Sequence, residues 1–200
     1  LHMWVQHLLD GQFADASAYA QKIWLQNFPI FVTRNLDEAK QYITSRFEGE
    51  ISKRYGILAS SKDRILPEYG IPNGFQDTKR VKNAKWYNED LGTPGSCCNM
   101  QEVVTEFGCQ GLELDMAIVA WGNDFMWSGN NWELRKMRTR IPQVDPHQLR
   151  LNSYRVLLTR SREGIIVFIP PKPEFDATEH AFLAAGARLL DSRIPLAEIS

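Results

Sequence analysis

Short apolar runs alternate with amphipathic segments along this chain, and this alternation limits the fold more than any other feature. Residues 30–33 are typical of a buried strand, and residues 55–60 form the next such run. Between them, Asn35 is placed to cap a helix whose apolar face includes Leu36 and Ile43. A strand, a crossover helix and a second strand predict a parallel sheet with helices on both faces, the three-layer α/β class.

The same alternation extends over most of the chain, and we predict one domain of 200 residues. About five parallel strands are expected, the later ones at 102–105, 115–121 and 165–169, with helices at 147–163 and 177–190. The remaining predicted parts are a helical lead-in at 1–26, long insertions at 61–100 and 122–145, and a tail at 191–200.

Composition excludes several classes of function. An apolar content of 44% is enough for one core, and a net charge of −1 indicates no global field for nucleic acid. Three cysteines are too few for a disulfide framework, and no His/Cys cluster has zinc spacing, so no metal site is predicted. No apolar run approaches the roughly 20 residues that span a membrane, and no signal peptide is evident. We therefore predict a cytoplasmic protein without a membrane partner.

A first polar segment begins where a predicted strand ends. Thr105 closes the strand, which is where ligands bind in open parallel sheets, and Gly108 and Gly111 allow close approach to a ligand. Gln110 and Glu113 add polar groups beside them. The alternative is an ordinary turn with polar decoration.

A second segment carries Arg155 and Arg160, five residues apart on a predicted helix that leads into an apolar run. In one interpretation these arginines are solvated groups on a core helix. In the other, Arg160 projects into a cleft and neutralises charge on a γ-phosphate.

A phosphate loop is absent from the sequence. Such a loop reads Gly-x4-Gly-Lys-Ser/Thr, and the nearest match, residues 92–96, is followed by two cysteines and no lysine. No Asp-Glu pair follows an apolar strand to hold magnesium either. The chain alone is therefore not expected to hydrolyse ATP well.

Taken together and in this order, the two segments resemble the last two motifs of superfamily-one nucleic-acid helicases. The matching positions of the first are Thr105, Gln110, Gly111, Glu113 and Asp115, and those of the second are Asn152, Arg155, Val156, Leu158, Thr159, Arg160, Ser161 and Arg162. Segments 31–40, 55–61, 85–88 and 105–111 further resemble the Schlafen group-3-like DNA/RNA helicase domain. This resemblance covers the chain from Trp4 to Phe168.

The resemblance implies a three-layer RecA-like fold and the C-terminal half of a longer ATPase. An N-terminal RecA-like domain of the same protein would supply the phosphate loop, and the parent would use ATP and Mg²⁺. The implied residue roles are an arginine finger for Arg160, a second phosphate or coupling contact for Arg155, the nucleotide ribose or domain seam for Glu113, phosphate sensing for Gln110 and Gly111, and the nucleic-acid backbone for Thr105, Ser60 and Ser61. Ser60 and Ser61 could instead be capping residues at a strand end.

Further candidates for nucleic-acid binding lie in the insertions. Arg135, Lys136, Arg138 and Arg140 follow Trp132, and basic residues beside an aromatic suit a nucleic-acid strand. The alternative is a solvated hairpin. Trp86, Tyr87 and Trp127 are either stacking platforms or anchors for the loops that hold them.

The function that this pattern implies is that of the second motor domain of an ATP-dependent helicase or translocase on single-stranded DNA or RNA. Two alternatives stay open: a regulatory NTPase or defence-type scaffold that does not unwind duplexes, and an interaction domain whose arginines are structural.

Overall fold

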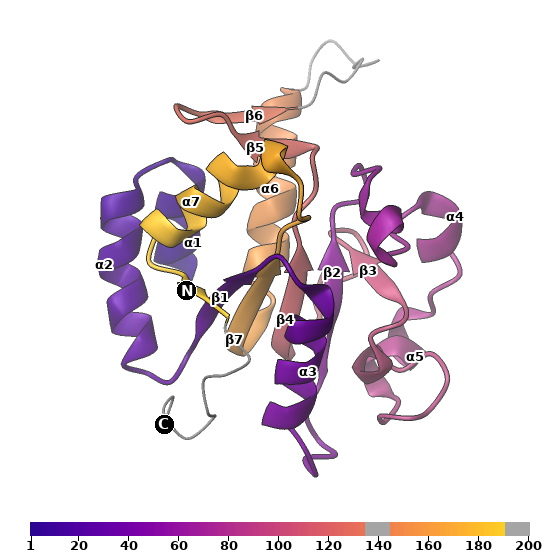
Figure 1. The fold of residues 1–200 in the computed structure, drawn as a ribbon. Helices are drawn as coiled ribbons and strands as arrows, with labels where there is room; N and C mark the ends of the chain where they lie inside the picture. The colour runs from indigo at the N-terminus through magenta and orange to yellow at the C-terminus, as the bar shows by residue number, and fades with distance from the viewer. Residues whose placement is uncertain (135–144, 191–200) are drawn as a thin grey trace.

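A six-stranded, entirely parallel sheet forms the centre of the protein in a computed structural model, which describes residues 1–134 and 145–190. The strands are β1 (Ile30–Thr33), β2 (Tyr55–Ala59), β3 (Val103–Thr105), β4 (Leu114–Ala120), β7 (Ser161–Phe168) and β8 (Arg188–Leu189). Their order across the sheet is β3-β2-β4-β7-β1-β8, and every neighbouring pair is parallel. In Figure 1 the strands point upward, so their carboxyl ends form the upper edge.

Helices cover both faces of this sheet. They are α1 (His2–Leu9), α2 (Phe13–Trp24), α3 (Leu36–Arg46), α4 (Phe75–Thr78), α5 (Asn83–Asn88), α6 (Pro146–Leu158) and α7 (Asp176–Ala184). In Figure 1, α3 lies in front of the sheet and α6 behind it, as right-handed crossovers in opposite directions require. The predicted three-layer α/β fold is confirmed.

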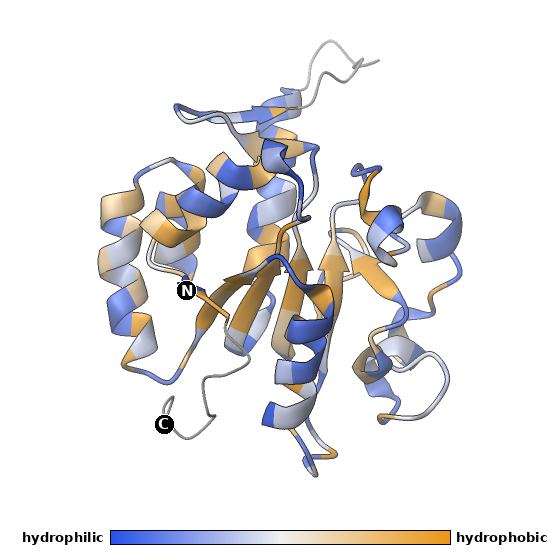
Figure 2. Ribbon diagram, in the orientation of Figure 1, coloured by the Kyte–Doolittle hydropathy of each residue, from blue (hydrophilic) through white to orange (hydrophobic). Residues whose placement is uncertain are grey.

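Burial explains why the central strands are such uniform apolar runs. All seven residues of β4 are buried, as are the last five of β7, because helices cover both sides of a parallel sheet. Figure 2 shows the strands as an apolar band between helices of mixed character. The predicted cap of α3 is also confirmed: the Asn35 side-chain oxygen accepts hydrogen bonds from the N–H groups of Asp37 and Glu38 at 3.0 and 3.2 Å.

Two predicted helices are shorter than expected. The helix predicted at 147–163 ends at Leu158, where the Thr159 hydroxyl donates to the Arg155 carbonyl at 2.8 Å. Strand β7 then begins at Ser161, opposite Leu114. The helix predicted at 177–190 ends at Ala184, and residues 188–189 form the sixth strand, β8, beside β1. In the sequence, the helical pattern of apolar residues continues beyond the last residue of both helices. The residues that follow pair with neighbouring strands, and this pairing ends the helices.

Segment 61–100 and the described part of segment 122–145 contain more secondary structure than the sequence indicated. Segment 61–100 holds α4, α5 and the 3₁₀ turns η1 (Leu66–Tyr69) and η2 (Cys97–Asn99). Its Trp86 is fully buried and donates its indole N–H to the Glu102 carbonyl at 3.3 Å, so it anchors the loop. The described part of 122–145 contains an antiparallel hairpin, β5 (Phe125–Trp127) with β6 (Trp132–Leu134). The predicted tail, 191–200, lies outside the described residues.

Within the described ranges, none of the helices combines the length and the apolar character needed to cross a bilayer. All three cysteines are free and buried.

A glycine at the end of α7 provides a test of this packing. Gly186 has φ +89°, and an added Cβ would lie 2.6 Å from the Ala20 Cβ and 3.1 Å from the Ser17 Cα on α2. We expect Gly186→Ala to lower the free energy of unfolding by about 2–4 kcal/mol, from backbone strain and overpacking together. Urea unfolding of the chain measures this loss.

Gly49→Ala is the matched control. Gly49 has φ +79°, but nothing lies within 4 Å of its added Cβ, so only the backbone cost of about 1–2 kcal/mol is expected. Equal losses in the two variants would contradict the contact between α2 and the end of α7.

Candidate functional site

The candidate residues are divided between the two edges of the sheet. Thr105 ends β3 and Ser60 follows β2, so both lie at the carboxyl edge. Arg160 directly precedes β7, and Glu113 directly precedes β4, so these two lie at the amino edge. The seven residues of β4 separate the edges by about 20 Å. The candidate residues therefore form two groups, one at the carboxyl edge and one at the amino edge.

A buried ionic network lies under the carboxyl edge. Arg150 on α6 is only 6% exposed, and its Nε lies 3.0 Å from the Asp124 carboxylate. One of its terminal nitrogens donates to the Ser60 hydroxyl at 3.0 Å and lies 3.6 Å from Glu106. The Ser60 hydroxyl in turn donates to Asp124 at 2.6 Å, as does the phenol of Tyr154. A buried charge is tolerated only when it is paired and hydrogen-bonded in this way.

Protonation in this network is shifted by the low polarity around it. Burial raises the pKa of the Asp124 carboxyl above its ordinary value, while Arg150 and the hydroxyl of Ser60 partly oppose the rise. Burial and the neighbouring Asp124 raise the pKa of the Tyr154 phenol well above its usual range. Tyr154 therefore stays a proton donor, and it also accepts the Gly122 N–H at 3.0 Å.

Ser60 and Ser61 take different roles. The Ser60 side chain is completely buried, and its hydroxyl is used inside the network. Ser61 is partly exposed: its N–H and its hydroxyl donate to the Glu106 carboxylate at 2.9 and 2.8 Å. Ser61 is therefore accessible from the surface, whereas Ser60 is not.

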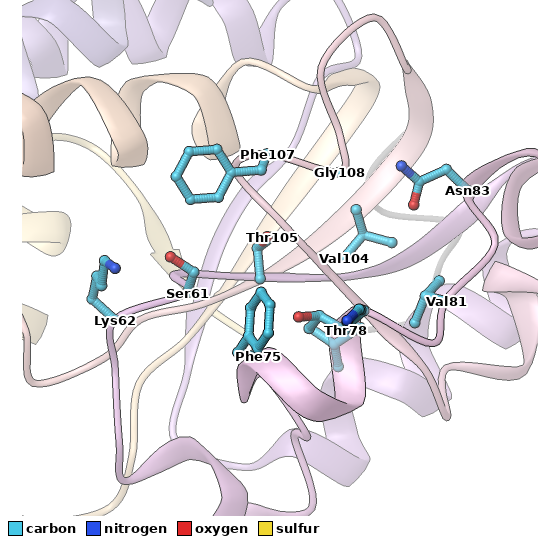
Figure 3. Close-up of a pocket in the computed structure, with 12 residues that line it drawn as sticks. Ser61, Lys62, Phe75, Thr78, Val81, Asn83, Val104, Thr105, Phe107 and Gly108 are labelled. Atoms are coloured by element: carbon cyan, nitrogen blue, oxygen red, sulfur yellow. The ribbon is translucent and has the colours of Figure 1, made fainter.

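A pocket of about 560 Å³ opens beside Ser61 and Thr105. Figure 3 shows Phe107 and Phe75 on opposite sides of Thr105. The pocket is lined by Ser61, Lys62, Phe75, Thr78, Lys79, Val81, Asn83, Val103, Val104, Thr105, Phe107 and Gly108. Two lysines and no acidic residue line it, so it favours an anionic ligand.

Phe75 and Phe107 were not among the residues that the sequence indicated. Their exposed fractions are 71% and 67%, and no other phenylalanine, tyrosine or tryptophan of the described ranges is exposed. Phe107 lies inside the first motif, two residues after Thr105, where its position could have drawn attention. Phe75 lies in the long insertion, between Gly74 and a basic stretch that begins at Lys79.

The amino edge gathers the second group. The backbone N–H of Leu114, the first residue of β4, donates to the Arg160 carbonyl at 2.8 Å, so the residue before β7 lies against the start of β4, which the loop of Gln110, Gly111 and Glu113 precedes. These three loop residues are exposed. Burial raises the pKa of the neighbouring Cys109 thiol to about 12, and the positive charge of Arg160 partly opposes that rise.

The two arginines of the second motif differ in their contacts. The Arg160 Nε donates to the Val156 carbonyl at 3.0 Å, and within the described ranges its guanidinium makes no ion pair. Arg155 donates to the Asn152 side chain at 2.8 Å, while its buried Nε has no hydrogen-bond partner among the described residues. Both side chains are partly exposed, so both can reach a ligand at the surface of α6.

Comparison with known proteins identifies the family. A family model described as the Schlafen group 3 DNA/RNA helicase domain matches residues 1–171. The chain belongs to this helicase-domain family. No curated protein and no solved structure matches the chain significantly. The match confirms the resemblance seen in the sequence and, with the parallel three-layer sheet, a RecA-like helicase domain.

The remaining candidates of this helicase domain are the tryptophans and the basic residues of the insertions. The tryptophans pack inside the domain, and the basic residues lie outside the described part. Trp132 is 3% exposed and donates its indole N–H to the Leu8 carbonyl, and Trp127 packs edge-on against Phe13. With Trp86, these tryptophans anchor loops. The basic residues Arg135, Lys136, Arg138 and Arg140 lie outside the described residues. No cluster of three or more potential metal ligands occurs in the ranges 1–134 and 145–190.

The network predicts a strong and pH-dependent cost for losing its cation. Arg150→Met leaves Asp124 and Glu106 buried without their partner, which we expect to lower the free energy of unfolding by about 3–5 kcal/mol near neutral pH. A buried carboxyl with a raised pKa loses stability as pH rises through that pKa, and removal of the guanidinium raises the pKa further. Urea unfolding should therefore show a smaller deficit at about pH 5 than at about pH 8.

Arg162→Met serves as the control. Its side chain is 51% exposed and pairs with Asp115 at 3.4 Å, so a loss of less than about 1 kcal/mol is expected. A pH-independent deficit in Arg150→Met would show that the carboxylates do not depend on Arg150.

Proposed function

We propose that this domain is the second motor domain of an ATP-dependent DNA/RNA helicase or translocase. It would act with an N-terminal RecA-like domain of the same protein. Membership of the helicase-domain family supports the proposal. The observation that carries it is the meeting of two distant motifs at one edge: Arg160 lies against the loop that leads into β4, joined by the 2.8 Å bond from Leu114.

That edge offers one side of a nucleotide site. Arg160 has a guanidinium without an ion pair in the described ranges, and a phosphate would supply the missing negative charge. Gln110 and Glu113 are exposed polar groups of the loop that leads into β4, and Gly111, with φ +78° and open space around it, lets the backbone approach a ligand. These residues fit the outer side of bound ATP, which supplies the γ-phosphoryl group that is transferred to water.

The remaining parts of the nucleotide site must come from elsewhere. The sequence has no Gly-x4-Gly-Lys-Ser/Thr loop, and no metal-ligand cluster appears among the described residues. Under this proposal, the partner RecA-like domain holds the phosphates and Mg²⁺, while Arg160 neutralises charge on the γ-phosphate and Arg155 assists. Closing of the two domains would exclude bulk solvent and keep only the water that accepts the phosphoryl group.

The opposite edge suits the nucleic acid. Ser61, whose hydroxyl donates to Glu106, and Thr105, 6% exposed, line a pocket with Lys62 and Lys79 and without acidic residues. Lysines are common partners of the sugar-phosphate backbone, and the Ser61 oxygen can still accept a hydrogen bond from a sugar hydroxyl. Under this proposal the amino edge of the sheet faces ATP, and the carboxyl edge faces the nucleic-acid strand.

A regulatory NTPase without unwinding activity is the second candidate, since the same arginine would serve it. In the intact parent protein, strand displacement measured beside ATP turnover separates the two. Turnover stimulated by single strands without displacement of a duplex favours the regulatory function. An interaction domain with structural arginines would show neither activity.

The finger assignment is tested in the parent protein by Arg160→Ala. We expect ATP turnover to fall on the order of 10³-fold, because charge on the γ-phosphate is no longer neutralised in the transition state. Folding should be little affected, since Arg160 is partly exposed and makes no ion pair within the described ranges.

Arg188→Ala is the matched control, an exposed arginine at the start of β8 that lies outside both motifs and whose guanidinium is 4.0 Å from the centre of the Trp24 ring. Its turnover should remain within about twofold of the unchanged protein, because a weak surface cation–π contact is all that it loses. If Arg160→Ala turned over ATP as fast as Arg188→Ala, Arg160 would not be the finger.

A further inference from the structure

Two exposed phenylalanines at the carboxyl edge have no role in the packing of the domain. Phe75 and Phe107 line the same pocket from different segments, α4 and the β3–β4 loop. In Figure 3 their rings lie on either side of Thr105. An exposed Phe forgoes the stabilisation of about 1.5–3 kcal/mol that burial of such a side chain supplies. Two of them at one pocket indicate a surface that binds something.

The exposure of Phe107 is fixed by its neighbours. Glu106 is 4% exposed and held by Ser61, and Cys109 is 1% exposed, with its N–H bonded to the Thr105 carbonyl at 3.0 Å. Gly108 lies so close to β3 that a Cβ there would come within 2.7 Å of the Val104 side chain. The turn is therefore tight on both sides of Phe107, and its ring is presented to solvent by a rigid frame.

Phe75 is presented from the opposite side with a cation beside it. It is the first residue of α4, after Gly74, and the Lys79 ammonium lies 5.7 Å from the centre of its ring. Lys79 also lines the pocket. The ring is thus part of a surface that combines an aromatic face with positive charge.

The chemistry of the pocket selects the ligand class. Aromatic faces stack on bases, lysines pair with phosphates, and hydroxyl groups bond to the backbone of a strand. An apolar peptide would not need Lys62 and Lys79, and an acidic peptide would not need two exposed rings. In a duplex the faces of the bases are already stacked on each other, so rings such as these can reach bases only in an unpaired strand.

We propose that Phe75 and Phe107 form a base-stacking subsite for single-stranded nucleic acid, with Lys62 and Lys79 holding the adjoining phosphates. This inference rests on the proposed function, because it specifies how the strand is held at the carboxyl edge. Asn83, which also lines the pocket, supplies an amide that can bond to the edge of a stacked base. The subsite makes the domain prefer unpaired strands to duplexes.

Fluorescence anisotropy of labelled oligonucleotides on the intact parent protein tests this. The probes are single-stranded DNA and RNA of the same length, the corresponding duplex, and a DNA strand with abasic sites along its length. We expect Phe75→Ala and Phe107→Ala each to weaken single-strand binding by about tenfold, the size of one lost stacking contact. Affinity for the abasic strand should not change, because it offers no base to stack.

Variants sharpen the test. Phe75→Tyr and Phe107→Tyr keep the ring and should restore binding. Leu25→Ala removes an exposed apolar side chain (87% exposed) at the C-terminal end of α2 and should have no effect. Replacing Lys62 and Lys79 by alanine should weaken binding of base-bearing and abasic strands alike and reduce the salt dependence.

The outcomes separate the two proposals. If the unchanged protein binds base-bearing and abasic strands equally well, or if the alanine variants bind single strands as before, the subsite is disproved while the motor function stands. If the unchanged protein binds no strand at all, both proposals fail. Unaltered urea unfolding of the alanine variants shows that any loss is not caused by misfolding.

Discussion

The buried charge of Arg150 is the constraint on which the carboxyl edge of this domain depends. Its guanidinium, 6% exposed, is accommodated in the interior because Asp124 and Glu106 approach it and Ser60 accepts a hydrogen bond from it. These partners come from three separate segments, after β2, after β3 and after β4. Each must hold its position for the charge to be compensated. One arginine thereby fixes the ends of three neighbouring strands relative to α6.

This network also links the two surfaces to which we assign function. Glu106 binds both Ser61, on the pocket, and Arg150, near the start of α6. The 13 residues of α6 run for about 20 Å to Arg160 at the amino edge. A displacement of Arg160 when the nucleotide changes would be carried by a stiff helix to the residues that hold Ser61. Under the proposed function, this is a direct physical route from the ATP side to the strand side.

Much of the fold was predictable because parallel strands buried on both faces leave apolar runs in the sequence, as at 30–33 and 115–121. β8 was missed because its two residues are exposed and fall within a helical pattern. The early end of α6 was missed because the hydroxyl of Thr159 and the pairing of β7 with β4 act through tertiary structure. The ionic network could not be predicted for the same reason: its members are far apart in the sequence.

The candidate site, like the fold, could be predicted only in part. The motif positions indicated Thr105, Ser60 and Ser61 as candidates. Which of the two serines faces outward could not be predicted, because it depends on where β2 ends and on the buried Asp124 that binds Ser60. An apolar residue such as Phe107 is by default expected in the core. It is exposed because the residues on both sides are held inward, Glu106 by two hydrogen bonds from Ser61 and an ion pair with Arg150, and Cys109 by burial and the turn to Thr105. The network around Arg150 that secures the edge of the sheet thus also includes the neighbour of the ring that is proposed to stack on bases.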